Sequence, residues 1–150
     1  VSAIDREVEA STIVESLRSG SRRNGGALLT AHARMGTPGA AAYRERVRSG
    51  DALGHLAVAQ ALVWRPLGLT EGEAVAISGY GLVSALMAAA IRLGAVGAIE
   101  AQVIAARLLD VVAAAAAAPV ADGRPLRSFV PLAEIAAMRH GGCGQRLFAN

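Results

Sequence analysis

Residues 70–93, TEGEAVAISGYGLVSALMAAAIRL, decide the fold class. Thr70 and Glu73 have the spacing of a capping box, in which each side chain accepts a hydrogen bond from the other residue's backbone amide. The residues from 74 to 93 include six alanines and three leucines, which have high helix propensity, and Gly94 follows where a helix end is expected. The stretch therefore predicts one long helix that begins at Thr70 and ends near Leu93.

This helix contains an uncharged run, Ala74–Ile91. A run of about 18 residues is at the lower limit for a membrane-spanning helix. Much of it is alanine and glycine, and it includes Ser78 and Ser84. We therefore expect the central helix of a helical bundle, apolar on all sides because neighbours cover it. A membrane helix remains the alternative.

The composition favours helices along the rest of the chain. Hydrophobic residues make up 53% of the 150 residues, much of this fraction is alanine, and aromatic residues make up 3%. We expect one all-α domain, a helical bundle over residues 1–150. All fifteen basic residues are arginine and the net charge is +3. The densest basic stretch, residues 44–48, includes Glu45, so we expect no nucleic-acid binding.

Turn residues predict the other helix boundaries. We expect helices over residues 1–19, 27–35, 40–48 and 52–64. Gly20 and Asn24-Gly25-Gly26 should separate the first two, and Gly36-Thr37-Pro38-Gly39 should form a loop. Asp51 is a candidate N-cap for the fourth helix, which Pro66 should end.

The C-terminal part predicts two more helices and a tail. A helix should run from residue 97 to residue 118 and stop at Pro119, and Pro131 suits the first position of a final helix that ends at His140. The glycine-rich residues 141–150 should form a flexible, partner-binding tail. One stripe on the 70–93 helix should allow close backbone packing: Gly81, Ala85 and Ala89.

Few residues suggest metal or nucleotide chemistry. His140 and Cys143 are weak candidates for metal ligands, because a closed zinc site needs four ligands. The glycines around Cys143 follow a helix, and the chain has no lysine, so we expect no phosphate-binding loop. A single cysteine excludes an internal disulfide and fits a reducing cytoplasm, and the charged first residues do not resemble a signal peptide.

No catalytic motif is visible. Asp51, His55 and a serine could be named as a triad, but nothing in the sequence places them together, and there is no G-x-S-x-G motif. His55 lies in an apolar stretch, where a hydrogen-bonded core histidine is expected. We therefore predict a protein that is not an enzyme and has no cofactor.

The end of the chain contains a candidate interaction motif. Arg146, Leu147 and Phe148 follow the glycines, and arginine and aromatic residues are enriched at interface hot spots. Such a tail either becomes ordered on a partner or folds back on its own bundle.

Several stretches together resemble one family. AVAQALVWR at residues 57–65, followed by GLT at 68–70, is similar to a signature of the UreF urease accessory proteins. SRRNGGALL at residues 21–29 resembles a second UreF stretch, and Arg92-Leu93 with Gly97 and Gln102 keeps the spacing of a third. MRH at 138–140 and RLF at 146–148 match the family's C-terminal signature. The resemblance covers the last two-thirds of the family's length, without its N-terminal segment.

The resemblance implies a cytoplasmic all-α accessory protein for nickel insertion into urease. Family members dimerise, bind the accessory protein UreD (also called UreH), recruit the GTPase UreG and dock on urease apoprotein subunits. Nickel and GTP are handled by the partners. The family's tail binds partners, which implies that role for five residues here: Arg139, His140, Arg146, Leu147 and Phe148.

Other functions remain open. They are a degenerate UreF-like paralogue, a small membrane-associated helical protein built on Ala74–Ile91, and a metal carrier that uses His140 and Cys143.

Overall fold

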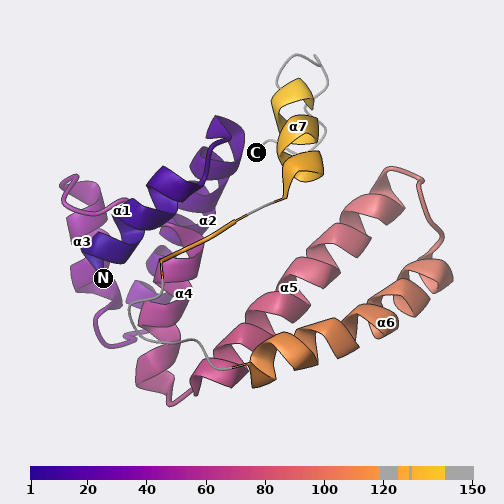
Figure 1. Cartoon of the computed structure of the whole chain (residues 1–150). Coiled ribbons are helices and arrows are strands. Elements are labelled where there is room, and N and C mark those ends of the chain that lie inside the picture. The colour runs from indigo at the N-terminus through magenta and orange to yellow at the C-terminus, as the bar shows by residue number, and fades with distance from the viewer. Residues whose placement is uncertain (119–124, 129, 141–150) are drawn as a thin grey trace. The chain divides into compact units, whose positions relative to one another are not determined.

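The computed structural model describes residues 1–118, 125–128 and 130–140, which form helices and connecting segments with no strand among them (Figure 1). The all-α fold predicted from the sequence is therefore confirmed. The helices are α1 (Ser2–Ser11), α2 (Glu15–Arg34), α3 (Ala40–Arg48), α4 (Leu56–Trp64), α5 (Glu71–Arg92), α6 (Ala98–Ala117) and α7 (Pro131–His140). The predicted tail, residues 141–150, lies outside the described residues.

The chain divides into two compact units. Unit 1 comprises Val1–Pro66 and the described residues from Pro125 onward, and unit 2 comprises the described residues from Leu67 to Ala118. The core of unit 1 lies where α2, α3 and α4 meet, and α1 adds Val8 to it. The fully buried core side chains include Leu29 and Val63.

Helix α2 continues through the glycines that were expected to interrupt it. Gly20 and Asn24-Gly25-Gly26 are all helical, and the break falls earlier, at residues 12–14. The prediction was wrong because tertiary contact outweighs local propensity here. A Cβ atom on Gly25 would overlap the Gly54 carbonyl oxygen and lie 2.9 Å from the His55 carbonyl carbon. Gly25 is therefore the position where α2 allows another backbone to approach closely.

The predicted N-cap at Asp51 was also wrong. Helix α4 starts at Leu56, and His55 is its N-cap residue. Residues 53–55 are non-helical because their backbone amides donate to the carboxylate of Asp5, and Gly54 has a φ of +75°. Asp51 instead accepts a hydrogen bond of 2.6 Å from the Ser49 hydroxyl.

Unit 2 is a hairpin of α5 and α6. The predicted capping box at its start is confirmed: the Thr70 amide donates to Glu73 at 2.7 Å, and the Glu73 amide donates to Thr70 Oγ1 at 3.3 Å. The helices approach closely at Gly72, which faces the Ala116 carbonyl, and at Gly79, which faces Val112.

The prediction of which small residues allow the two helices to pack closely was therefore wrong. Gly81 has open space around it, and Ala85 is exposed. The contacting glycines, Gly72 and Gly79, are seven residues apart, which is two helical turns.

The expectation that α5 would be covered on all sides was wrong as well. By length and mean hydropathy, 1.9, the helix could cross a membrane, yet 6% of its apolar 18-residue window is buried, and Val83 is its one buried residue. Packing against α6 buries one side chain fully and leaves the others of this apolar helix half-buried or exposed. Length and composition do not by themselves distinguish a membrane span from a helix that packs against protein.

The other boundary predictions are confirmed. The loop at residues 36–39, helix α3, the end of α4 before Pro66 and the last helix from Pro131 to His140 all lie where turn residues placed them.

Substitution of Gly25 by alanine tests the close approach of α2 to residues 54–56. We expect Gly25→Ala to lower the free energy of unfolding by about 2–3 kcal/mol, because the methyl group has no space. Gly26→Ala is the matched control: its methyl group would meet nothing within 4 Å, so the lower chain entropy of alanine should raise stability by about 0.5–1 kcal/mol. Urea unfolding measures both, and equal effects would contradict the packing argument.

Candidate protein-binding site

A buried carboxylate ties α1 to the start of α4. Asp5 is fully buried, and its Oδ2 atom accepts hydrogen bonds from the amides of Leu53 at 2.6 Å and Gly54 at 2.8 Å, and from the Tyr43 hydroxyl at 2.9 Å. The His55 amide donates to Oδ1 at 3.0 Å. Three successive amides thus bind one carboxylate, which balances its charge without a cation.

The same contacts change two pKa values. Burial alone would raise the pKa of the Asp5 carboxyl, but hydrogen bonds from Gly54, His55, Tyr43 and Leu53 together hold that pKa below its ordinary value. Burial, reinforced by the hydrogen bond to Asp5, raises the pKa of the Tyr43 hydroxyl. Asp5 is therefore charged and Tyr43 neutral across the physiological pH range.

A second polar group extends from the first. His55 is fully buried, its Nε2 lies 2.7 Å from Glu9 Oε2, and its Nδ1 lies 3.2 Å from Ser21 Oγ. The Leu56 amide also donates to Ser21 Oγ, and Arg22 donates to Glu9 at 2.9 Å. His55 is therefore the hydrogen-bonded core histidine predicted from the sequence.

These groups connect α1, α2 and the start of α4. The triad considered from the sequence is not assembled, because the carboxylate beside His55 belongs to Glu9 while Asp51 is exposed and bonded to Ser49. Neither cavity described below is lined by Ser21, His55 or Glu9. The hydroxyl of Ser21 is already occupied by a backbone amide and the imidazole.

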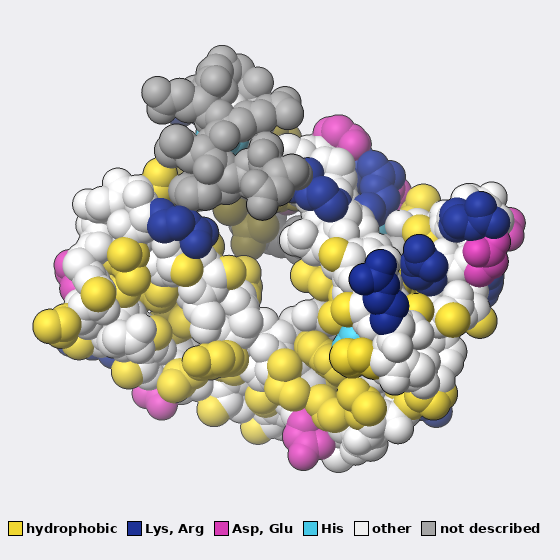
Figure 2. All heavy atoms as spheres, turned by 180° about the vertical axis from the view of Figure 1, so that it is seen from behind, with side chains coloured by type: hydrophobic (Ala, Val, Ile, Leu, Met, Phe, Trp, Pro, Cys, Tyr) yellow, Lys and Arg dark blue, Asp and Glu magenta, His cyan; other side chains and the backbone are white. Residues whose placement is uncertain are grey.

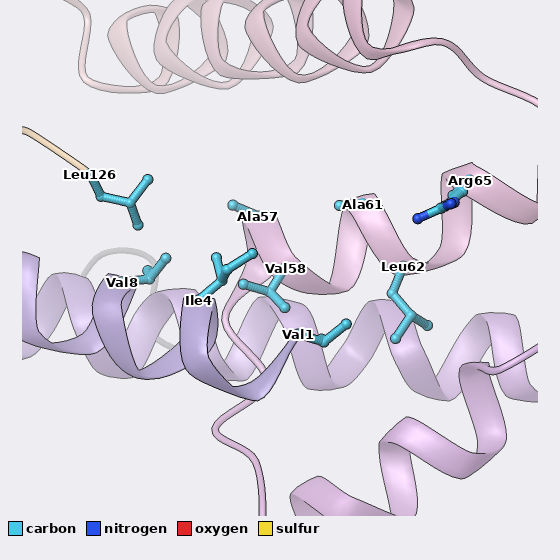
Figure 3. A pocket seen from close by; sticks show the side chains of 9 residues that line it. All are labelled: Val1, Ile4, Val8, Ala57, Val58, Ala61, Leu62, Arg65 and Leu126. Atoms are coloured by element: carbon cyan, nitrogen blue, oxygen red, sulfur yellow. The ribbon is translucent and has the colours of Figure 1, made fainter. Parts of the chain in front are cut away.

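Unit 1 carries an apolar groove between α1 and α4, which we name the α1–α4 groove (Figure 3). Its volume is about 360 Å³. The residues that line it are Val1, which is the N-cap of α1, Ile4 and Val8 of α1, Ala57, Val58, Ala61 and Leu62 of α4, Arg65, and Leu126. Ile4 is 53% exposed, so the groove is open to solvent.

Unit 2 presents a wider apolar face. A cavity of about 510 Å³ lies between α5 and α6, and Met87, Ile91 and Leu109 line it together with neutral polar side chains. Large side chains elsewhere on the hairpin are also exposed, including Leu82 at 62% and Val111 at 64%. Figure 2 shows hydrophobic side chains at the surface over this hairpin. Exposed apolar surface of this extent is typical of proteins that bind other proteins or membranes.

The residues predicted to bind partners are described only in part. Arg139 and His140 are exposed at the end of α7, while Arg146, Leu147 and Phe148 lie outside the described residues. Cys143, the proposed metal ligand beside His140, also lies outside them. Within the described ranges, no cluster of three or more His, Cys, Asp or Glu side chains could hold a metal ion.

Sequence reasoning missed the roles of Asp5 and Glu9. Both residues belong to the charged first stretch of the sequence, and their partners at residue 55 are 46 to 50 positions away. Asp5 and Glu9 are four residues apart, as two acidic residues on an exposed helix face often are. Nothing in the neighbouring sequence therefore indicates that their carboxylates have buried partners.

Comparison with known proteins identifies relatives. The UreF family model matches residues 1–109. The urease accessory protein UreF of Yersinia pestis (strain Pestoides F) is 30% identical over 109 residues, which are 72% of this chain and 48% of that protein. The UreF protein of Trichodesmium erythraeum is 39% identical over 85 residues, which are 56% of this chain and 37% of that protein.

The chain thus spans about half the length of the curated relatives it matches. The family match ends at residue 109, so the similarity of the C-terminal residues stays a prediction. No solved structure matches the chain.

Removal of the Asp5 charge tests the role of this carboxylate. We expect Asp5→Asn to lower the free energy of unfolding by about 3 kcal/mol, because the asparagine nitrogen would face at least one backbone amide donor in either orientation of its side chain. Asp51→Asn, at an exposed carboxylate, should change stability by less than about 0.5 kcal/mol. Chemical denaturation measures both free energies of unfolding, and equal losses of stability would refute the stabilising role of the Asp5 carboxylate.

Acid should remove the same stabilisation. Because the folded-state pKa of Asp5 lies below its ordinary value of 3.8, its contribution is complete well above pH 4 and is lost as pH falls through the folded-state pKa. The stability difference between the native protein and Asp5→Asn should therefore shrink below about pH 4. A difference that stays constant from pH 7 to pH 3 would contradict this.

Proposed function

The chain belongs to the UreF family, and from this premise we propose that it is a non-catalytic scaffold protein of urease maturation. The family match over most of the chain is the observation that carries the proposal. The folded residues are consistent with it, because the buried polar groups hold helices together while the open surfaces are apolar.

The proposed partners follow from the family. The chain would bind UreD, called UreH in some bacteria, recruit the GTPase UreG and dock the assembly on urease apoprotein subunits in the cytoplasm. Nickel and GTP would be handled by those partners, so the chain itself needs no cofactor.

A homodimer is also part of the proposal. The exposed apolar face of α5 and α6 supports it, because such a face is stabilised when a second protein surface covers it. A C2 dimer would bury this face against its own copy.

A second candidate function is a membrane-associated helical protein. The observation that favours it is the length and low burial of α5 (Glu71–Arg92). It predicts that the chain partitions into detergent, whereas the scaffold stays in the aqueous phase with its partners.

The scaffold function is tested by co-purification with the cognate UreD. We expect UreD to co-purify with the full chain and to be lost, at least tenfold, from a chain that lacks residues 141–150, because the tail is the proposed contact. The double variant Arg146→Ala, Phe148→Ala should show most of that loss. Arg48→Ala, an exposed arginine on α3, is the control and should bind normally. Failure of the full chain to retain UreD would refute the proposal.

A further inference from the structure

The α1–α4 groove has the form of a helix-binding site. On α4, Ala57 and Ala61 are exposed and one turn apart, and Val58 forms the floor between them and α1. Ile4 lines the opposite wall. Two helices with small residues on one side and larger aliphatic residues on the other leave a channel into which an apolar helix face fits.

One end of the groove carries a positive charge. Among the described residues that line the groove, Arg65 has the one charged side chain, and it lies one turn beyond Ala61. No carboxylate among the described residues contacts its guanidinium. In Figure 3 its side chain lies beside Leu62, at the opposite end of the groove from Leu126. An arginine at the end of an apolar channel is complementary to a carboxylate on whatever fills that channel.

The other end shows how the groove holds an aliphatic side chain. Leu126 belongs to a non-helical segment, its side chain lines the groove, and its backbone amide donates to Glu7 Oε1 at 2.8 Å. The channel from Ala57 to Arg65 stays open. Since these residues are eight positions apart on helical backbone, this channel is about 12 Å long.

We propose that the α1–α4 groove binds a helix of a partner protein that presents aliphatic side chains to Ala57 and Ala61 and a carboxylate to Arg65. The spacing requires the acidic residue about one turn beyond the second aliphatic residue. This inference rests on the proposed scaffold function and adds a docking surface separate from the C-terminal residues. The aliphatic contacts supply affinity, and the pair with Arg65 sets the direction of the bound helix.

Photo-crosslinking tests the proposal. The full chain carrying p-benzoylphenylalanine in place of Ala61 is mixed with cognate UreD, UreG and urease apoprotein and irradiated, and the crosslinked peptides are identified by mass spectrometry. The matched control carries the same residue in place of Ala42, which is exposed on α3 of the same unit. We expect position 61 to crosslink one partner, at a helical peptide with an acidic residue about one turn beyond an aliphatic residue, and position 42 to give at least tenfold less.

Arg65 variants supply the second measurement. In the chain that carries the crosslinker at position 61, Arg65→Glu should reduce the crosslink yield at least tenfold, and Arg65→Lys should keep most of it. Both variants should have the same unfolding temperature as the chain with Arg65, because this side chain is exposed. The proposal is overturned by an equal yield from position 42, by no effect of Arg65→Glu, or by no crosslink to a partner. Crosslinks confined to this chain or to a second copy overturn it too. If UreD is retained by the native chain and position 61 crosslinks nothing, the groove inference fails and the scaffold function stands.

Discussion

The binding of the Asp5 carboxylate by the amides of residues 53–55 is the interaction on which unit 1 depends. It keeps those residues out of helical conformation, sets the start of α4 and fixes α1 across the bundle. The turn it creates lies against α2, which is possible because Gly25 has no side chain. His55 and Glu9 then extend the contact toward Ser21. A local prediction cannot find this arrangement, because the partners lie 34 to 50 positions apart in the sequence.

Unit 2 follows from different constraints, most of them local. The capping box at Thr70 begins α5, the glycine at position 94 follows its end, and alanine-rich sequence maintains both helices. Contact between the helices uses Gly72 and Gly79 and buries one stripe. The hairpin therefore depends mainly on contacts between residues close in the sequence. Most of its large apolar side chains remain exposed, so their burial requires a further surface.

The sequence was informative wherever one residue type determines backbone conformation. Capping residues, prolines and left-handed glycines placed α3, α5, α6, α7 and the end of α4. Predictions failed where a glycine allows close packing inside a helix, as at Gly25. They also failed at Asp51, where the predicted cap is not formed and the side chain binds Ser49 instead. The family resemblance was informative for a different reason, because it depends on many positions in order. Of the candidate site, sequence reasoning indicated the core histidine but not its two carboxylate neighbours.

The distribution of charge bears on how the proposed scaffold would distinguish its partners. In unit 1, Glu9 of α1 pairs with Arg22 of α2 and contacts His55 at the start of α4, so these contacts hold helices together, whereas Glu15 pairs with Arg18 within α2. An apolar surface alone supplies affinity but discriminates little between partner proteins, because aliphatic side chains can pack together in several registers and orientations. Arg65 lines the α1–α4 groove, where a charge pair with a bound helix would fix the orientation of that helix. The cavity of unit 2 is lined by neutral side chains such as Tyr80, Ser84 and Gln102. That cavity can select by shape and hydrogen bonding but not by charge, which suits a surface that meets its own copy better than one that must distinguish among partners.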